Sequence, residues 1–316
     1  MGINYKIAII GLGSIGKRHL FNIEKVLEAR GISYSIDLIR RDFNNELSDD
    51  IKSMVNNIYT DYSNVPDDYD VIFITNPTHL HFDTIKSYVP KTKHMFIEKP
   101  VFSDTAPSVQ ELMLNEKGIY YVACPLRYTD VIQYVKHEID LSRVYSVRTI
   151  CSSYLPYWRA GVDYRNTYSA HADEGGGVSI DLIHEWDYIV YLFGHPDRVE
   201  NFRGKVSHLE IDSDDLSIYI AKYKNLMAEI HLDYFGVQTI RELQLFTYED
   251  TIIADIANSK ITYLKRNETI SFAESRNDYQ LKEISAFFDV IEGKTVNPND
   301  IDSAVMTLKI AKEGSL

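Results

Sequence analysis

A glycine-rich turn near the start of the chain constrains the fold more than any other feature of the sequence. The apolar segment KIAIIG at 6–11 runs directly into GLGSIG, after which the sequence has helical spacing to about residue 30. Glycines at this spacing allow a tight turn, a close approach of the backbone to a pyrophosphate and close packing of the helix on the strand. The free N–H groups at the start of the helix attract phosphate. The residues expected to hold a dinucleotide are Gly11, Gly13, Ser14, Ile15 and Gly16.

The first 123 residues alternate between short apolar runs and amphipathic segments. Nearly continuous apolar strands that alternate with helices are typical of a parallel sheet covered on both faces. We therefore expect an α/β, doubly wound dinucleotide-binding domain at 1–123. Its strands are expected at 6–11, 35–40, 70–75, 94–99 and 119–124, and its helices at about 14–30, 46–57, 80–89 and 106–116.

The pattern changes in the second half, where long alternating segments follow one another across short polar turns. Such spacing predicts an antiparallel meander and hence an α+β domain at 124–316 built on a large, mostly antiparallel sheet. The stretch 278–313 returns to helical spacing, interrupted near Gly293 and Pro298. The expected strands lie within 144–154, 216–223, 226–235, 240–248, 251–257, 260–266 and 268–274.

Composition narrows the classes of partner. The 316 residues carry a formal net charge of -13, and no window concentrates Lys and Arg, so nucleic acid and membrane surfaces are not expected partners. The N-terminus shows no secretory pattern, and the apolar runs are far shorter than the roughly 20 residues of a membrane span. Cys124 and Cys151 lie at no metal-ligand spacing, so we expect a cytoplasmic protein without a metal site.

The end of the second expected strand indicates which cofactor is bound. Dinucleotide sites usually place an acid there to accept hydrogen bonds from the ribose 2′-hydroxyl. Here the strand ends IDLIRRD, with Arg40 where the acid is expected, Arg41 beside it and Asp42 after both. Arginines match the charge and geometry of a 2′-phosphate, which favours NADP(H). NAD(H) stays open, with one arginine stacked on the adenine and Asp42 reaching the ribose.

The segment FIEKPVFSD places a lysine at the end of a central strand. Ligands of open parallel sheets bind outside the carboxyl ends of the strands, so Lys99 is expected to face that crevice. Pro100 after it is a candidate for a cis peptide bond that directs the lysine. The alternative is a solvated lysine before a turn.

The segment GGGVSIDLIHEWD at 175–187 combines glycines with acids and a histidine. The helical pattern runs from Val178 to Phe193 and ends at Gly194. Asp181 and His184 would then share one helix face, about 60° apart at 100° per residue. The triple glycine would let this helix start close to another backbone or to the cofactor. Glu185 is expected to face solvent or to make a capping bond, and Asp187 is a candidate substrate contact.

These motifs, in this order, resemble the glucose-fructose oxidoreductase, inositol dehydrogenase and MocA (Gfo/Idh/MocA) family of NAD(P)-dependent enzymes over nearly the whole chain. The family's GxGxxGxxH start, its strand ending in Pro with a later His, and its EKP, RY and GGG/Asp/His motifs all have counterparts. Those counterparts are Gly11, Gly13, Gly16 and His19; Asn76, Pro77 and His81; Glu98, Lys99 and Pro100; Arg127 and Tyr128; and Gly175–Gly177, Asp181 and His184.

The resemblance implies a Rossmann domain and a division of catalytic roles. By it, His184 is the acid/base, Lys99 orients or polarises the reacting oxygen, and Asp181 binds a neighbouring substrate hydroxyl. One departure is that many members read DxxxH where this chain reads DLIH, so its substrate is expected to differ from theirs. Family members commonly pack the outer face of the second sheet against another subunit, so a homodimer or homotetramer is expected. Further cofactor contacts are expected at Thr75, Asn76, Pro77, His81, Glu98 and Lys99.

The long segment before the triple glycine is expected to fold over the cleft as a substrate loop. Aromatic side chains beside arginines suit a sugar ring that carries carboxylate or phosphate. A loop that contacts a second subunit is the alternative. The expected substrate contacts are Arg127, Trp158, Arg159, Tyr164, Arg165, His171, Asp181 and His184.

Three functions remain open at the level of sequence. The leading one is hydride transfer between NAD(P) and a hydroxyl or keto carbon of a sugar, a cyclitol or a nucleotide-linked, possibly acidic, sugar. A second is cofactor-assisted glycoside hydrolysis, which some relatives perform without net NAD(P)H production. A third is a redox sensor that binds the cofactor without turnover, against which Lys99, Asp181 and His184 argue.

Overall fold

The computed structural model describes residues 4–42 and 46–314 and divides the chain into two compact units. One unit comprises Met1–Ala123 and Gln280–Ala304, and the other comprises Cys124–Tyr279 and Val305–Leu316. The expected second domain, 124–316, is therefore interrupted, because residues 280–304 return to the first unit. The reason is packing: Phe287 lies 5.3 Å from the Phe96 ring, and Phe288 lies 5.3 Å from the Tyr5 ring.

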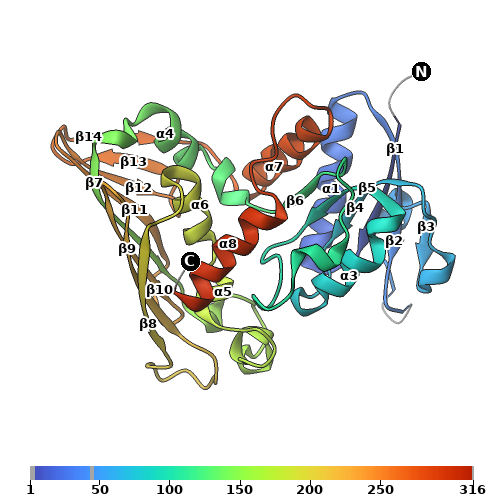
Figure 1. Cartoon of the computed structure of the whole chain (residues 1–316), viewed down its shortest axis with the longest axis horizontal. Coiled ribbons are helices and arrows are strands. Elements are labelled where there is room, and N and C mark those ends of the chain that lie inside the picture. The colour runs from blue at the N-terminus through green and yellow to red at the C-terminus, as the bar shows by residue number, and fades with distance from the viewer. Residues whose placement is uncertain (1–3, 43–45, 315–316) are drawn as a thin grey trace. The chain divides into compact units, whose positions relative to one another are not determined.

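The first unit is built on a six-stranded sheet in the order β3-β2-β1-β4-β5-β6, and every pair in it is parallel. This confirms the doubly wound parallel sheet (Figure 1). The short strand β3 was not expected, because three residues with little apolar character carry no pattern of their own. The strands are β1 (Asn4–Ile10), β2 (Ser33–Ile39), β3 (Asn57–Tyr59), β4 (Tyr69–Ile74), β5 (Thr92–Ile97) and β6 (Tyr120–Val122).

Helices pack on this sheet through aromatic side chains. The rings of His19 in α1 (Ser14–Ala29) and Phe287 in α7 (Arg276–Ile291) both contact Phe73 and Phe96, so α1 and α7 cover one face. The helices α2 (Asp49–Met54) and α3 (His81–Tyr88) complete the unit. The prediction of a helix at 106–116 is wrong.

That stretch forms only the 3-10 turn Val109–Leu112. Asp104 Oδ1 accepts the backbone N–H groups of Thr105 and Ala106, and Pro107 follows, so side-chain bonds to the backbone compete with a helix start.

The second unit is built on an eight-stranded sheet in the order β14-β13-β12-β11-β7-β10-β9-β8. It is mostly antiparallel, as expected, but it is not a simple meander. The strand β7 lies between β11 and β10 and runs parallel to β10. The edge strand β8 was not expected. The strands are β7 (Val144–Ser152), β8 (Arg198–Gly204), β9 (Leu216–Lys222), β10 (Met227–Asp233), β11 (Ile240–Thr247), β12 (Thr251–Asp255), β13 (Lys260–Tyr263) and β14 (Glu268–Ser271).

Helices of the second unit lie on one face of this sheet (Figure 1). They are α4 (Asp130–Glu138), α5 (Val178–Asp181), α6 (His184–Phe193) and the end of α8 (Ile301–Glu313). Trp186 of α6 packs edge-on against Tyr219 of β9 at 5.2 Å, and the Tyr219 hydroxyl donates to the carbonyl oxygen of Ala311. Side chains of the opposite face, among them Phe202, Ile220 and Met227, are exposed.

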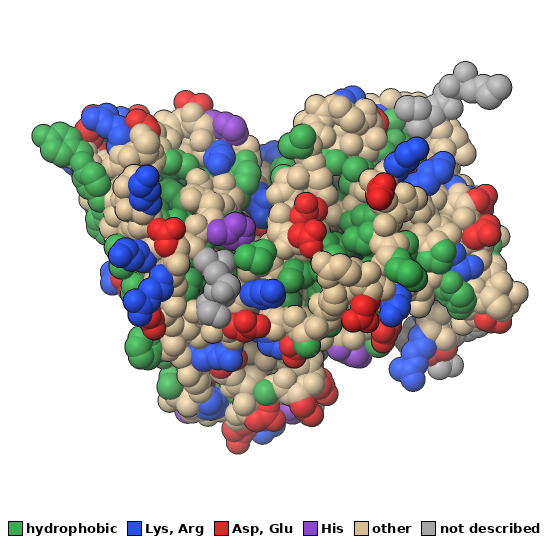
Figure 2. All heavy atoms as spheres, in the orientation of Figure 1, with side chains coloured by type: hydrophobic (Ala, Val, Ile, Leu, Met, Phe, Trp, Pro, Cys, Tyr) green, Lys and Arg blue, Asp and Glu red, His purple; other side chains and the backbone are tan. Residues whose placement is uncertain are grey.

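Charge is dispersed over the visible surface. On the face drawn in Figure 2, acidic and basic side chains are interspersed and form no single basic stripe. Within the described residues, no helix combines the length and the apolar character that crossing a membrane requires.

Candidate functional site

The glycine turn between β1 and α1 leaves room for a phosphate. Gly11 has a φ of +89°, and a Cβ on it would lie 2.9 Å from the backbone of Asn76. A Cβ on Gly16 would lie 2.4 Å from the carbonyl oxygen of Gly11, whereas one on Gly13 would meet nothing within 4 Å. The N-terminus of α1 has no side-chain cap and no acid in its first turn. This cradle fits a pyrophosphate, because the backbone packs closely at Gly11 and Gly16 but leaves open space beside Gly13.

Two polar residues expected to touch the cofactor instead support this turn. The buried Thr75 hydroxyl donates a hydrogen bond to the carbonyl oxygen of Gly11 at 2.7 Å. His81 is 1% exposed, with Nε2 3.0 Å from the carbonyl oxygen of Asn76 and Nδ1 3.1 Å from that of Pro100. Burial lowers the pKa of His81, and the carbonyls oppose this effect. Both side chains thus hold loops together beside the glycine turn.

Asn76 and Pro77 lie at the end of β4, beside the same turn. The Asn76 side-chain amide donates to Thr84 Oγ1 at 2.8 Å, and its own Oδ1 is buried without a hydrogen bond among the described residues. Pro77 precedes the 3-10 turn Thr78–Leu80. Their backbone borders the glycine cradle, as the close approach of Gly11 to Asn76 shows.

The two arginines after β2 lie beside the glycine turn. The carbonyl oxygen of Ile39, the last residue of β2, accepts the N–H of Gly11 at 3.0 Å. Arg40 follows directly and is partly exposed, and Arg41 is exposed. The sheet register therefore places Arg40 at the edge where a nucleotide ribose lies in dinucleotide-binding sheets.

Glu98 connects the start of α1 to the lysine at the end of β5. Its Oε1 lies 2.6 Å from Nε2 of His19, and its Oε2 accepts the backbone N–H of Lys99 at 3.1 Å. Burial acts to raise the pKa of Glu98, but the His19 hydrogen bond and the Lys99 charge hold the pKa below its ordinary value. Glu98 was expected to bind the cofactor; its carboxylate oxygens are used within the protein instead. The expected cis peptide bond between Lys99 and Pro100 is confirmed.

The helix expected from Val178 to Phe193 is two helices. The first, α5, ends at Asp181, and α6 begins at His184. Between them the N–H groups of Ile183 and Glu185 bond to carbonyls three residues earlier, and Leu182 has a φ of -96° and a ψ of +28°, outside helical values. Asp181 and His184 therefore belong to two separate helices. The face that they were expected to share on one α-helix, at 100° per residue, does not follow from this backbone.

The triple glycine lets the chain pass close to a neighbouring backbone. A Cβ on Gly176 would lie 2.1 Å from the carbonyl oxygen of Tyr168, and one on Gly177, where φ is +132°, would lie 2.3 Å from Asp214 Oδ1. The carbonyl oxygen and the carboxylate of Asp214 accept the first N–H groups of α5, at Val178 and Ser179. The expected close approach to another backbone is confirmed. Asp214 as the cap of α5 was not foreseen, because it comes from a distant segment.

Asp181 is held by two tyrosines that sequence reasoning missed. The Tyr234 hydroxyl donates to Asp181 Oδ2 at 2.6 Å, and Asp181 is 7% exposed. Burial, followed by the charge of Asp181 and a hydrogen bond to it, raises the pKa of Tyr168. Burial and the same carboxylate raise the pKa of Tyr234 well above its ordinary value. Both phenols therefore remain donors at neutral pH. No local pattern in the sequence indicated this role, because a tyrosine next to a strand is usually interpreted as a core residue.

Two further acids, both on α6, are buried against arginines. Arg127, 4% exposed, donates from Nε to Asp187 Oδ2 at 3.0 Å and from Nη2 to Oδ1 at 2.7 Å. Glu185 is fully buried, with Arg241 Nε 2.8 Å from its Oε1. The solvated Glu185 that the sequence led us to expect is therefore wrong. Arg127 and Asp187, expected as substrate contacts, bind each other instead.

The loop before the triple glycine divides into two parts. Trp158 packs edge-on at 5.2 Å against Tyr234, and the Arg159 guanidinium lies 5.7 Å from the Tyr168 ring, so these two border the tyrosines that hold Asp181. The small hollow that this loop encloses, lined in part by both residues, measures about 10 Å³ and has no room for a sugar.

The other expected loop contacts bind neighbouring residues. Arg165 pairs with Asp163 and with Glu210, each at 2.7 Å. The Tyr164 hydroxyl accepts the N–H of Glu210, and Nε2 of His171 lies 2.8 Å from the carbonyl oxygen of Arg165. These three side chains shape the loop through bonds to their neighbours, whereas Trp158 and Arg159 border the tyrosines that hold Asp181.

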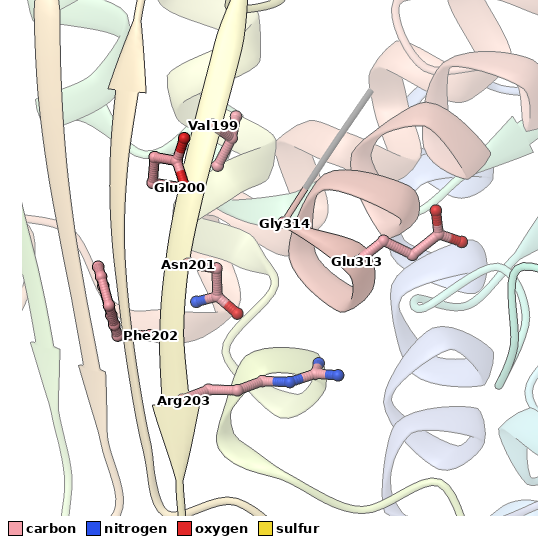
Figure 3. Close-up of a pocket in the computed structure, with 7 residues that line it drawn as sticks. All are labelled: Val199, Glu200, Asn201, Phe202, Arg203, Glu313 and Gly314. Atoms are coloured by element: carbon pink, nitrogen blue, oxygen red, sulfur yellow. The ribbon is translucent and has the colours of Figure 1, made fainter.

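A hollow of about 520 Å³ lies elsewhere in the second unit, between β8 and the end of α8. Arg203 extends from β8 toward that helix end, where its Nη1 donates to the carbonyl oxygen of Lys312 (Figure 3). None of the residues expected at the functional site lines this hollow. Its lining residues are Val199, Glu200, Asn201, Phe202, Arg203, Glu313 and Gly314. In residues 4–42 and 46–314, no three His, Cys, Asp or Glu side chains gather as a metal site.

A comparison with known protein families matches the part of the chain that carries the glycine cradle. Residues 5–122 match the model of the GFO_IDH_MocA oxidoreductase family, described as an NAD-binding Rossmann fold. The domain at residues 5–122 is therefore the NAD-binding Rossmann domain of the Gfo/Idh/MocA oxidoreductase family. The resemblance found in the sequence is thereby confirmed.

Two curated proteins and one solved structure are similar to this chain. The uncharacterized oxidoreductase YrbE of Bacillus subtilis (strain 168) is 27% identical over 191 residues, 59% of this chain and 53% of that protein. Myo-inositol 2-dehydrogenase of Thermotoga maritima is 24% identical over 197 residues, 60% of this chain and 55% of that protein. The match thus spans about half the length of these curated relatives. Levoglucosan dehydrogenase in complex with NADH and levoglucosan superposes with a TM-score of 0.82 at 18% identity, covering 98% of this chain and 96% of the other. This chain and levoglucosan dehydrogenase therefore share one fold.

Proposed function

We propose that this protein is an NAD(P)-dependent oxidoreductase that transfers a hydride between nicotinamide and a hydroxyl or keto carbon of a sugar, a cyclitol or a nucleotide-linked, possibly acidic, sugar. The observation that carries the proposal is a partly exposed histidine that lies three residues after a carboxylate fixed by tyrosine. His184 begins α6, three residues after Asp181. Asp181 Oδ2 accepts a hydrogen bond from the Tyr234 hydroxyl at 2.6 Å. Inositol and levoglucosan, named for two relatives, are polyhydroxylated rings that suit such a pair.

The roles of these residues follow from their chemistry. An imidazole is suited to accept the proton of the reacting hydroxyl near neutral pH. The Asp181 carboxylate accepts a hydrogen bond from a neighbouring substrate hydroxyl, and its tyrosines keep it in place. The Lys99 ammonium donates to the reacting oxygen and stabilises its negative charge. When bound, the nicotinamide supplies the hydride transfer itself. The meeting of Lys99 with His184 is part of this proposal, since the two belong to different units.

We further propose that NADP(H) is preferred to NAD(H). Arg40 and Arg41 follow β2 at the edge of the sheet that carries the glycine cradle, and a guanidinium binds a 2′-phosphate through paired, charge-assisted hydrogen bonds. Arg41 is exposed and Arg40 partly so, as a site for the end of a nucleotide requires.

We also propose that two copies of this chain associate through the open face of the eight-stranded sheet. That face carries exposed apolar side chains on neighbouring strands: Phe202 on β8, Ile220 on β9 and Met227 on β10 are 72%, 38% and 44% exposed. The strand register places Ile220 diagonally between Phe202 and Met227, with Glu200 and Glu229 directly opposite it. Exposed apolar side chains surrounded by polar ones are typical of a protein interface.

The function is tested by offering the purified protein NADP or NAD with a panel of cyclitols, anhydrosugars, acidic sugars and nucleotide-linked sugars. We expect net reduction of the nicotinamide, followed by its absorbance in the near ultraviolet. Lys99→Ala and His184→Ala should each retain cofactor binding in a fluorescence titration and lose turnover by roughly 10²- to 10⁴-fold.

The matched controls are Lys93→Ala and His208→Ala, which change the same residue types away from the proposed chemistry. Near-wild-type turnover in either Lys99→Ala or His184→Ala would refute the role assigned to that residue. Bond cleavage in a glycoside without net nicotinamide reduction would favour the hydrolase, and cofactor binding without turnover of any compound would favour the sensor.

A further inference from the structure

The interrupted helix raises the question of what sets the direction of His184. In one continuous helix, α5 would fix the rotation of α6 about its axis. Here Leu182 and Ile183 separate the two helices, so the anchors of Asp181 do not by themselves orient α6. The direction of His184, the first residue of α6, depends on contacts made by α6 itself.

The first such contact comes from the sheet beneath the helix. Glu185 is the neighbour of His184 and is 0% exposed, and Arg241 of β11 lies 2.8 Å from its Oε1. The N–H of Arg241 is not aimed at the oxygen, so the contact is an ion pair without an aligned hydrogen bond. Burial raises the pKa of Glu185, which the charge of Arg241 opposes.

The second contact comes from the segment that opens the second unit. Arg127 lies in the 3-10 turn Pro125–Tyr128 and forms a two-pronged bond to Asp187, at 3.0 Å and 2.7 Å. A two-pronged guanidinium–carboxylate bond fixes orientation as well as distance. Glu185 and Asp187 are two residues apart, so at 100° per residue they project from α6 in different directions, about 160° apart.

Two anchors in different directions restrict the rotation of a helix about its axis, which a single anchor does not. We propose that Arg241, acting through Glu185, and Arg127, acting through Asp187, are positioning residues that set the direction of His184 for proton transfer. The inference rests on the proposed function of His184. A buried ion pair often adds little net stability compared with apolar packing, so stability alone does not explain why α6 carries two.

The test compares the near-isosteric variants Glu185→Gln and Asp187→Asn with the wild type. A misplacement of a catalytic group by about 1 Å can lower a rate on the order of 10²-fold. We expect kcat per folded molecule to fall roughly 10- to 100-fold while the Kd for the cofactor changes less than about 2-fold, because the cradle lies in the other unit. Arg241→Lys keeps a cation near Glu185 and should lose less turnover than Arg241→Met.

The control is Asp250→Asn, because Asp250 is a buried acid of the same unit that pairs with Arg266 away from α6. It should lower the unfolding temperature without changing kcat per folded molecule. A second readout needs no substrate: the imidazole signal of His184, one of 10 histidines, is assigned in NMR spectra by its loss in His184→Gln. We expect this signal to shift in Glu185→Gln and Asp187→Asn and to stay unchanged in Asp250→Asn.

The two hypotheses fail in different ways. If wild-type protein turns over no compound in the panel, the proposed function fails, and the His184 signal alone decides the positioning role. If Glu185→Gln and Asp187→Asn leave the His184 signal in place, the inference is overturned, whatever the turnover. Should a glutamine or asparagine variant not fold, Arg241→Lys and Asp187→Glu provide the same comparison with the charges retained.

Discussion

At the scale of single residues, the positions that carry a family motif divide into those open to a ligand and those that support them. Gly13 would meet nothing within 4 Å if it carried a Cβ, whereas Thr75 and His81 are buried in bonds to neighbouring carbonyls. Glu98 binds His19 and the Lys99 backbone. A sequence motif does not distinguish residues that face a ligand from residues that support them, because the site needs both kinds.

Arg40 carries a prediction at this scale. Arg40→Glu should weaken NADP binding roughly 10- to 100-fold, because it replaces a charge-assisted hydrogen bond to the 2′-phosphate with repulsion. NAD binding should change less than about 3-fold, since NAD has no phosphate at that position. Fluorescence titration of the reduced cofactors measures both.

The control variant is Arg198→Ala, which removes an exposed arginine paired with Glu200 on β8. Equal losses for NADP and NAD in Arg40→Glu would contradict the assignment of a 2′-phosphate site to this arginine.

At the scale of elements, tertiary contacts connect segments that the sequence shows as separate. The His19–Glu98 pair joins α1 to the end of β5, so the helix that cradles the phosphate and the strand that presents Lys99 are held together. Likewise Tyr234, just after β10, holds the end of α5, and Arg241 and Arg127 hold α6. Within each unit, the ends of these elements are thus fixed by buried polar pairs.

The pair between α1 and β5 predicts a pH dependence of stability. Because the pKa of Glu98 is lowered in the folded protein, its carboxylate stabilises the fold above the ordinary carboxyl pKa. This contribution is lost as the pH falls through the lowered value. Glu98→Gln should therefore lower the unfolding temperature at neutral pH, and its difference from wild type should shrink below about pH 4.

Calorimetry at several pH values measures the difference, with Asp67→Asn as an exposed control in the same unit. A difference between wild type and Glu98→Gln that stays constant from neutral to acid pH would show that the carboxylate charge is not what holds the pair.

At the scale of the whole molecule, two compact units are joined by a chain that crosses between them after Ala123, after Tyr279 and after Ala304. The return of 280–304 to the first unit places the aromatic face of α7 on the parallel sheet. The second unit keeps helices on one sheet face and leaves the other with exposed apolar side chains. Each unit therefore has a core of its own.

The proposed association through that face predicts the effect of surface charges. A double variant, Phe202→Asp with Ile220→Lys, should convert dimers or tetramers to smaller species, because charges in the centre of an interface of about 1,600 Å² lose their hydration. Sedimentation or light scattering measures the mass, and circular dichroism checks that the fold is kept.

Val296→Asp is the control, because Val296 is 85% exposed on the first unit. A wild-type protein that is monomeric at micromolar concentration, or a double variant of unchanged mass, would contradict an interface at this sheet.

Much of this architecture follows from patterns that span only a few residues. Apolar runs and glycine spacing predicted five of the six parallel strands, the glycine cradle and the end of α6 at Gly194, because burial and positive φ leave marks in local composition. The prediction of a helix at 106–116 was wrong because Asp104 and Pro107 disfavour the start of a helix there. Strand β8 was missed because, as an edge strand, it is largely exposed and carries little apolar signal.

The partners of the buried charges were decided only by the tertiary structure. Asp181, His184 and Lys99 stand out in the sequence, yet Tyr234, Arg241 and Asp214 do not, because each comes from a distant strand or loop and has no spacing relation to its partner. The sequence by itself determined a dinucleotide cradle, two sheets and a candidate acid/base. Which buried acids pair with which arginines and tyrosines depends on distances between segments that a linear pattern does not contain.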